Sequence, residues 1–193
     1  MSDEIKSYSK VAVLYGGSSS EREISLITGK AVFDSLQLKG VNAILIDTIE
    51  PFIEVLKTEE VSHAWIALHG SDGEDGKIQS ILRMLNIKHT GSDPITCSIT
   101  MNKYFTKSIL QSNGFKTPEY MAVGLSTKYE DIVNKLNEPF VLKQCSEGSS
   151  IGIFMIESRE QYSAHFSEIV KNNDWIIAEH FMKGDEYTST YLN

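Results

Sequence analysis

The sequence predicts an α/β protein of two domains, a doubly wound parallel-sheet domain followed by an α+β domain that is incomplete at its C-terminus. Two observations carry this prediction. From residue 10 to residue 90, short apolar runs alternate with stretches of helical periodicity, as in a parallel sheet covered by helices. After the turn at 91–94 the alternation becomes irregular, so we divide the chain into domains 1–95 and 96–193.

The first domain is expected to start with a strand at 10–15, whose continuous apolar run is typical of a strand buried on both faces. A helix follows from Glu21 to Gly40, with Ser20 as its N-cap and carboxylates in its first turn. Helical spacing predicts a buried face made of Ile24, Ile27, Ala31, Val32 and Leu36. The remaining expected elements are strands at 41–47, 63–68 and 87–90 and helices within 48–60 and at 77–85.

The second domain is expected to open with a helix over 95–112, broken near Asn102 and Lys103. The further elements are strands at 119–123, 140–143, 151–156, 175–181 and 187–192, with helices at 129–136 and 158–171. The last of these strands reaches Asn193 without a cap or taper. We therefore expect this sequence to be part of a longer chain.

Composition restricts the class of protein. Of the 193 residues, 41% are hydrophobic and 23% are charged, which is ordinary for a soluble globular protein. The net charge of −8 argues against nucleic acid as a partner. No run is long enough for a membrane span, and the N-terminus lacks a signal core. Cys97 and Cys145 provide no disulfide framework or zinc site. We expect a cytoplasmic protein without a membrane partner; its oligomeric state stays open, and a homodimer is compatible with the sequence.

A loop rich in glycine and serine joins the strands at 140–143 and 151–156. Such a loop lets backbone N–H groups converge on one point, which suits phosphate, and Lys143 adds a positive charge at the strand end. It is not a Walker A loop, because the lysine precedes the glycines and a strand follows. By itself the segment is equally consistent with a hairpin that has a long loop.

Five stretches in the same order and at similar spacing resemble the D-alanine–D-alanine ligases, members of the ATP-grasp family. The two longest are 14–25, which reads Leu-Tyr-Gly-Gly-Ser-Ser-Ser-Glu-Arg-Glu-Ile-Ser, and 67–76, which reads Ala-Leu-His-Gly-Ser-Asp-Gly-Glu-Asp-Gly. The others are 102–103, 147–152 and 179–186. The resemblance covers nearly the whole chain and implies an ATP-grasp fold for the second domain.

The resemblance implies an amino-acid site at the end of the first sheet. Glu21 would bind the ammonium group of the first D-alanine, and His69 would lie near its carboxylate. Ser149 would hydrogen-bond to Glu21, which makes Glu21 and Ser149 the catalytic pair. Without the resemblance, Glu21 reads as a first-turn carboxylate, His69 as a loop histidine with satisfied hydrogen bonds, and Ser149 as a turn hydroxyl.

The resemblance also implies an ATP site. Lys103 and Lys143 would bind phosphate, with Ser149 and Ser150 in a loop over 146–152 that opens and closes on the nucleotide. Solvated lysines and turn hydroxyls are the alternatives. The remaining implied ligands are Glu179 for the adenine amine, Phe181 and Met182 for the adenine ring and Glu186 for the ribose hydroxyls, with plain core packing as the alternative for the two apolar side chains.

The implied reaction is ATP-dependent joining of two D-alanine molecules through an acyl phosphate, for peptidoglycan synthesis, cell-wall biogenesis and cell shape. Mg²⁺ is the implied metal, and the family keeps its ligands in a part beyond Asn193. One departure from the family is Gln144, where a proline usually follows the strand-end lysine; we expect a small local effect.

Three alternatives remain at this point. One is a ligase that joins D-alanine to D-lactate or D-serine, and another is a non-catalytic nucleotide-binding fragment. The third is a dinucleotide-dependent oxidoreductase, suggested by Asp47 at the end of the second strand. The loop at 16–20 lacks the Gly-x-Gly-x-x-Gly pattern which that class requires.

Overall fold

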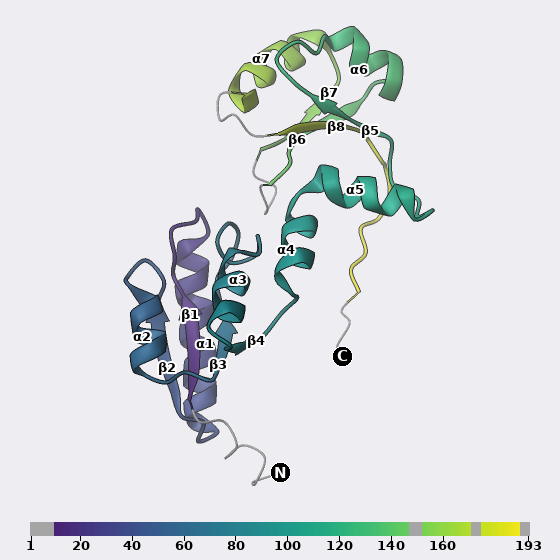
Figure 1. The fold of residues 1–193 in the computed structure, drawn as a ribbon. Helices are drawn as coiled ribbons and strands as arrows, with labels where there is room; N and C mark the ends of the chain where they lie inside the picture. Colours follow the sequence, from purple (N-terminus) through teal and green to yellow (C-terminus); the bar gives the residue numbers. More distant parts are fainter. Residues whose placement is uncertain (1–9, 147–151, 171–174, 190–193) are drawn as a thin grey trace. The chain divides into compact units, whose positions relative to one another are not determined.

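The computed structural model describes residues 10–146, 152–170 and 175–189 (Figure 1). The chain forms two compact units, 1–102 and 103–193, each with its own sheet. The boundary expected between residues 95 and 96 lies seven residues before this division, inside helix α4 (Pro94–Met101). The expected break near residue 102 is present, because α5 (Lys103–Ser112) starts separately after α4 ends.

The first unit contains a parallel sheet in the order β2-β1-β3-β4. Its strands are β1 (Val11–Tyr15), β2 (Ala43–Asp47), β3 (His63–Ile66) and β4 (Lys88–His89). The helices are α1 (Arg22–Leu38), α2 (Phe52–Thr58), α3 (Lys77–Met84) and α4. The parallel pairing of β1 with both β2 and β3 confirms the predicted fold class.

Helices cover both faces of this sheet. Leu14 packs in the cluster that contains Leu56 of α2 and Leu82 of α3. The next residue, Tyr15, points to the opposite face, because side chains alternate along a strand. There its Cβ lies so close to Gly29 of α1 that a Cβ on Gly29 would be 2.3 Å from it. The unit is therefore doubly wound.

The predicted buried face of α1 is wrong at Ile24, Ile27 and Ala31, which are all exposed. Ile24 and Ile27 are 55% and 68% exposed, whereas Ser25 and Gly29 are buried. The helix lies so close to Tyr15 that only small residues fit between the two. Hydrophobic periodicity therefore indicates the wrong side of this helix, since it cannot register a contact made by serine and glycine.

The second unit contains an antiparallel sheet in the order β5-β8-β6-β7. Its strands are β5 (Tyr120–Val123), β6 (Phe140–Gln144), β7 (Ile153–Ile156) and β8 (Ile176–His180). Helices α6 (Tyr129–Leu136) and α7 (Arg159–Val170) lie on one side of the sheet in Figure 1, and α5 lies on the other. The core includes Phe140, Leu142 and Ile156 of the sheet and Ile132 of α6.

Two expectations of the second domain lie wholly or partly beyond the described residues. The expected strand at 187–192 is absent over 187–189, and 190–193 are outside the described part. The loop expected to open and close is described only at residues 146 and 152, so its movement stays a prediction. Within the described ranges, no helix combines the length and apolarity needed to cross a bilayer.

Candidate functional site

Glu21 and the His69-Gly70 segment meet at the C-terminal edge of the first sheet, where open α/β sheets bind ligands. Gly70 has a φ of +68°, and a Cβ placed on it would lie 2.6 Å from Glu21 Oε2. The carboxylate of Glu21 therefore lies directly against the Gly70 backbone. Ser19 Oγ donates a hydrogen bond of 2.8 Å to the His69 carbonyl and ties the two loops together.

Glu21 occupies the N-cap position of α1, so the prediction of Ser20 as the N-cap is wrong. The Glu21 side chain makes no capping hydrogen bond to the helix. The His69 ring is held from the other side, with Nε2 3.1 Å from Thr28 Oγ1 and Nδ1 3.9 Å from Glu74 Oε1. The structure thus places the Glu21 carboxylate beside Gly70, the residue that follows His69.

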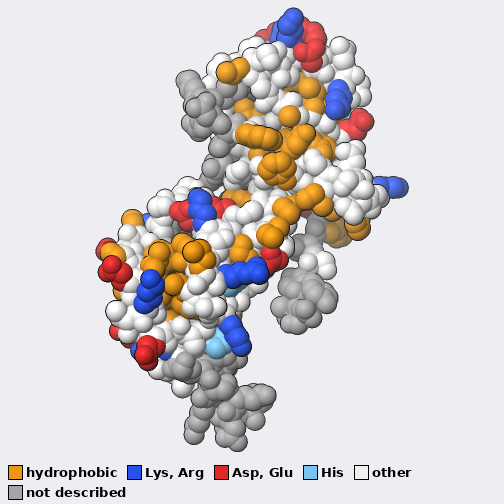
Figure 2. All heavy atoms as spheres, viewed as in Figure 1, with side chains coloured by type: hydrophobic (Ala, Val, Ile, Leu, Met, Phe, Trp, Pro, Cys, Tyr) orange, Lys and Arg blue, Asp and Glu red, His pale blue; other side chains and the backbone are white. Residues whose placement is uncertain are grey.

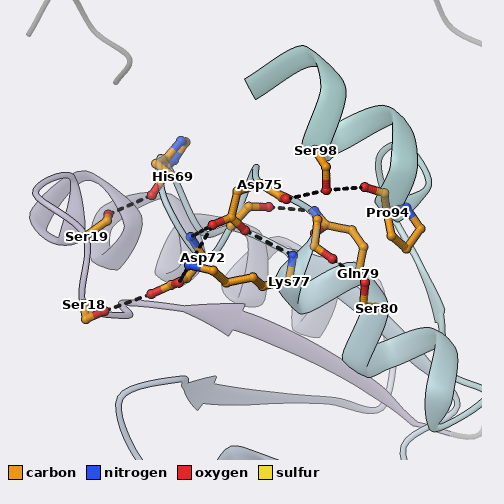
Figure 3. A network of polar contacts seen from close by, with 12 residues as sticks. Ser18, Ser19, His69, Asp72, Asp75, Lys77, Gln79, Ser80, Pro94 and Ser98 are labelled. Atoms are coloured by element: carbon orange, nitrogen blue, oxygen red, sulfur yellow. Dashed lines mark hydrogen bonds and ion pairs between the residues drawn. The ribbon is translucent and has the colours of Figure 1, made fainter. Parts of the chain in front are cut away.

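Ion pairs hold the loop at 69–76 in place (Figure 3). Lys77 Nζ lies 2.8 Å from Asp72 Oδ1 and 3.0 Å from Asp75 Oδ2. Ser18 Oγ donates to Asp72 Oδ2 at 2.9 Å, which joins this loop to the loop after β1. The hydrogen bonds from Lys77 and Ser18 lower the pKa of the Asp72 carboxyl. A hydrogen bond therefore joins the two signature loops of the first unit, and the carboxylate that accepts it is itself paired with Lys77.

Asp47 forms a bidentate ion pair with Arg22. The guanidinium donates to Asp47 Oδ1 at 3.0 Å and to Oδ2 at 2.6 Å, and the amides of Gly17 and Ile49 also donate to Oδ1. The Arg22 hydrogen bond is the largest cause that lowers the pKa of Asp47 to about 2. Because these four hydrogen bonds occupy the Asp47 carboxylate, it is poorly placed to accept one from a ribose hydroxyl. This argues against the dinucleotide-dependent oxidoreductase.

Ser25 is a residue that sequence reasoning did not single out. It is fully buried, its Oγ accepts from the Gly16 amide at 2.8 Å, and it donates to the Ala67 carbonyl at 2.7 Å. One hydroxyl on α1 thus joins the ends of β1 and β3, which precede the two signature loops. The sequence could have indicated this role, because Ser25 is the last residue of the first signature, 14–25.

The second unit gathers three lysines and one glutamate. Lys143 Nζ lies 2.6 Å from Glu179 Oε1, and Lys107 Nζ lies 2.7 Å from Glu179 Oε2. Lys103 starts α5, and both its amide and its Nζ donate to the Cys145 carbonyl just beyond Lys143, at 3.0 and 3.4 Å. Two lysines thus share one carboxylate, and a third lysine binds the carbonyl two residues beyond Lys143, so positive side chains gather beside the expected phosphate loop. Such a group of cations can attract an anion.

Lys107 was missed by sequence reasoning. The signal available was its spacing, since residues four apart on a helix lie on one face and Lys107 follows Lys103 by four. Glu179 is 9% exposed. Burial raises the pKa of its carboxyl, but the hydrogen bonds from Lys107 and Lys143 outweigh burial, so the pKa lies below the ordinary value.

Apolar side chains flank Glu179 on the same face of the sheet. Glu179 pairs with Val141, which pairs with Met155, and Lys143 pairs with Ile153 in the next row. Paired residues share a face. Ile153 and Met155 are 41% and 46% exposed. Figure 2 shows hydrophobic side chains at the surface of the second unit. A flat apolar wall beside a carboxylate suits an aromatic ring with a donor at its edge.

The other predicted ATP ligands either follow β8 or lie outside the described residues. Phe181 is half-buried, Met182 is 64% exposed and Glu186 is exposed, all in the irregular segment after β8. Ser149 and Ser150 lie outside the described residues. Among the described residues there is no group of three or more His, Cys, Asp or Glu side chains that could hold a metal ion.

Comparison with known proteins gives a consistent answer. The family described as D-ala D-ala ligase C-terminus matches residues 109–193. The D-alanine–D-alanine ligase of Pseudomonas putida strain GB-1 is 36% identical over 189 residues, which are 98% of this chain and 59% of that protein. The ligase of Albidiferax ferrireducens is 40% identical over 183 residues, which are 95% of this chain and 53% of that protein.

Solved structures agree. D-alanine–D-alanine ligase from Bacillus anthracis superposes with a TM-score of 0.82 at 29% identity, over 91% of this chain and 58% of that one. The same enzyme complexed with ATP gives a TM-score of 0.80 at 27% identity, over 91% and 59%. This chain thus spans less than two thirds of the length of these relatives. Over that length, the chain is similar in both fold and sequence to D-alanine–D-alanine ligases.

Proposed function

We propose that the protein containing this chain joins two D-alanine molecules into D-alanyl-D-alanine at the expense of ATP. The observation that carries the proposal is the buried Glu179 held by Lys107 and Lys143, with Lys103 on the nearby Cys145 carbonyl, in a chain whose relatives bear the name of this ligase. It supports an anionic ligand that also carries an N–H donor, and ATP has both features.

In this proposal the second unit binds ATP. Lys143 and Lys103 bind phosphate oxygens as mobile point charges. Glu179 accepts a hydrogen bond from the adenine amine, and the wall formed by Val141, Ile153 and Met155 contacts the ring. Phe181, Met182, Glu186 and the serines at 149 and 150 complete the proposed ATP ligands.

The first unit binds the first D-alanine. Glu21 is an acceptor for its ammonium group, and His69 lies in the adjacent loop for its carboxylate. The lysine cross-links of the loop at 69–76 keep His69 and Gly70 in place, and positioning of this kind supplies a large share of catalysis when two substrates must meet. The structure supports this half through the contact of Glu21 with Gly70.

The proposed reaction has two steps. A carboxylate oxygen of the first D-alanine attacks the γ-phosphorus of ATP, and ADP leaves. The amine of the second D-alanine then attacks the acyl carbon, loses a proton, and displaces inorganic phosphate. The lysines neutralise charge on the transferred phosphoryl group. The proposal includes Mg²⁺ with ligands from outside the described residues, and a cytoplasmic site of action, where ATP is available.

The protein encoded by the complete reading frame provides the test. We expect ADP and phosphate release that depends on D-alanine, and mass spectrometry should detect the dipeptide. Equal release with L-alanine, or release without any amino acid, would remove the ligase proposal. The homodimer stays a prediction that light scattering during size-exclusion chromatography would check.

Lys143→Ala provides a test of the ATP half. Because a charged hydrogen bond is worth about 1.5–3 kcal/mol, ATP affinity should fall about tenfold or more, while D-alanine affinity changes little. Lys128→Ala, on an exposed lysine of the same unit, is the matched control. If Lys143→Ala binds ATP as tightly as the wild type, Lys143 does not bind the nucleotide and has only a structural role.

A further inference from the structure

Lys107 has no hydrogen-bonding capacity left for a ligand. An ammonium group carries three donors. Those of Lys107 reach Glu179 Oε2 at 2.7 Å, Thr117 Oγ1 at 2.6 Å and the Pro118 carbonyl at 3.2 Å. Its Nζ also lies 5.2 Å from the centre of the Tyr120 ring, and its side chain is 10% exposed. Lys107 is therefore a fixed cation whose three donors are all used within the protein.

Lys143 is in a different situation. Its side chain is 21% exposed and sits at the end of β6, next to the expected phosphate loop. It donates to the other carboxylate oxygen of Glu179, Oε1. If Lys143 turns toward phosphate, Oε1 becomes the atom available to a base, while Oε2 stays on Lys107.

We propose that Lys107 is a positioning residue that makes the nucleotide site selective for a 6-amino purine. By holding Oε2 and balancing the charge of the buried carboxylate, it keeps Glu179 as a pure acceptor with Oε1 directed at the base. An ionised carboxylate accepts hydrogen bonds and donates none. It therefore favours the amino group of ATP and repels the 6-oxo group of ITP. The inference rests on the proposed function and specifies how its nucleotide is chosen.

Without Lys107, the buried carboxylate would have to turn toward Lys143 or take up a proton. A protonated carboxyl donates as well as accepts, so it would tolerate the 6-oxo group of ITP. Selectivity between the two nucleotides is thus the quantity that separates positioning from simple structural support. If Lys107 had only a structural role, its loss would weaken the binding of ATP and of ITP by the same factor.

Calorimetric titration of the complete protein with ATP and with ITP tests this inference. The wild type should bind ATP about tenfold to a hundredfold more tightly than ITP. In Lys107→Met the two affinities should come within about threefold of each other, mainly through weaker ATP binding. Lys107→Arg should retain most of the selectivity. Lys116→Met, which removes an exposed lysine from the neighbouring segment, should equal the wild type.

The possible outcomes separate the two levels of the argument. A wild type that binds neither nucleotide overturns the proposed function and this inference with it. A wild type that selects ATP and a Lys107→Met variant that selects it equally well overturn the inference alone. If circular dichroism shows that Lys107→Met does not fold, Thr117→Val decides: it removes one anchor of Lys107, and selectivity should narrow severalfold. Unchanged selectivity there overturns the inference.

Discussion

Replacing Asp47 by asparagine should destabilise the first unit by about 2 kcal/mol at pH 7. The carboxylate accepts two hydrogen bonds from Arg22 and one each from the amides of Gly17 and Ile49. Asparagine keeps one acceptor oxygen and loses the charge. The bidentate contact with Arg22 becomes a single hydrogen bond, and the guanidinium loses its counter-charge.

The magnitude follows from the pKa. Each tenfold change in an acid dissociation constant is worth about 1.4 kcal/mol. Lowering the pKa of Asp47 from 3.8 to about 2 thus corresponds to about 2.5 kcal/mol. The Asp47 side chain is 18% exposed, so solvent screening reduces this value slightly.

The pH dependence has a definite sign. Because the folded state depresses the pKa of Asp47, the contribution is present above the unfolded value of about 3.8 and is lost as pH falls toward about 2. The difference in unfolding free energy between wild type and Asp47→Asn should be nearly constant from pH 7 to pH 5. At pH 3 it should be about half as large.

Urea unfolding followed by tryptophan fluorescence measures this difference. Trp65 lies on β3 of the first unit and Trp175 lies in the second unit. A Trp175→Phe background therefore confines the signal to the first unit. Asp34→Asn is the matched control, because Asp34 forms an exposed pair with Lys30 on α1, and such pairs are worth about 0.3–0.5 kcal/mol.

Two results would refute the reasoning. Equal destabilisation by Asp47→Asn and Asp34→Asn would show that the bidentate contact with Arg22 adds nothing beyond a surface pair. A difference between wild type and Asp47→Asn that grows toward pH 3 would show that the folded state raises the pKa of Asp47.

Gly29→Ala would place a Cβ 2.3 Å from the Tyr15 Cβ, so urea unfolding should show a loss of about 1–3 kcal/mol; Gly124→Ala, where nothing lies within 4 Å, is the control, and equal effects would contradict the close packing of α1. Gly70→Ala would place a Cβ 2.6 Å from Glu21 Oε2 and displace that carboxylate, so kcat/KM for D-alanine should fall about tenfold to a hundredfold while ATP affinity is kept. An unchanged kcat/KM for D-alanine would show that Glu21 does not bind this substrate.

Local patterns in the sequence were sufficient for the two sheets and for most helices. The apolar run at 10–15 predicts a strand buried on both faces, and β1 is that strand, at the centre of the first sheet. The break near residue 102 and the helix at 129–136 were also predicted. These features depend on the alternation of apolar residues and on turn residues within a few positions of one another, which a single sequence displays directly.

The face of α1 was decided by tertiary structure. Ile24 and Ile27 form the apolar stripe that periodicity selects, yet Ser25 and Gly29 are buried. The deciding contact is with Tyr15, which precedes Gly29 by 14 positions and belongs to another element. Burial here reflects how closely two elements approach, and hydropathy carries no measure of that distance.

The charge partners were likewise decided only by the fold. From the sequence, Asp47 suggested a ribose ligand, Glu179 an adenine ligand, and Lys107 nothing at all. The fold pairs Asp47 with Arg22 and places Glu179 between Lys107 and Lys143. The paired residues lie 25 to 72 positions apart in the sequence. Whether they meet depends on strand order and register, which a short sequence motif does not contain. The sequence by itself predicted most of the elements and the resemblance to the ligases, whereas tertiary structure decided which charges are paired with each other.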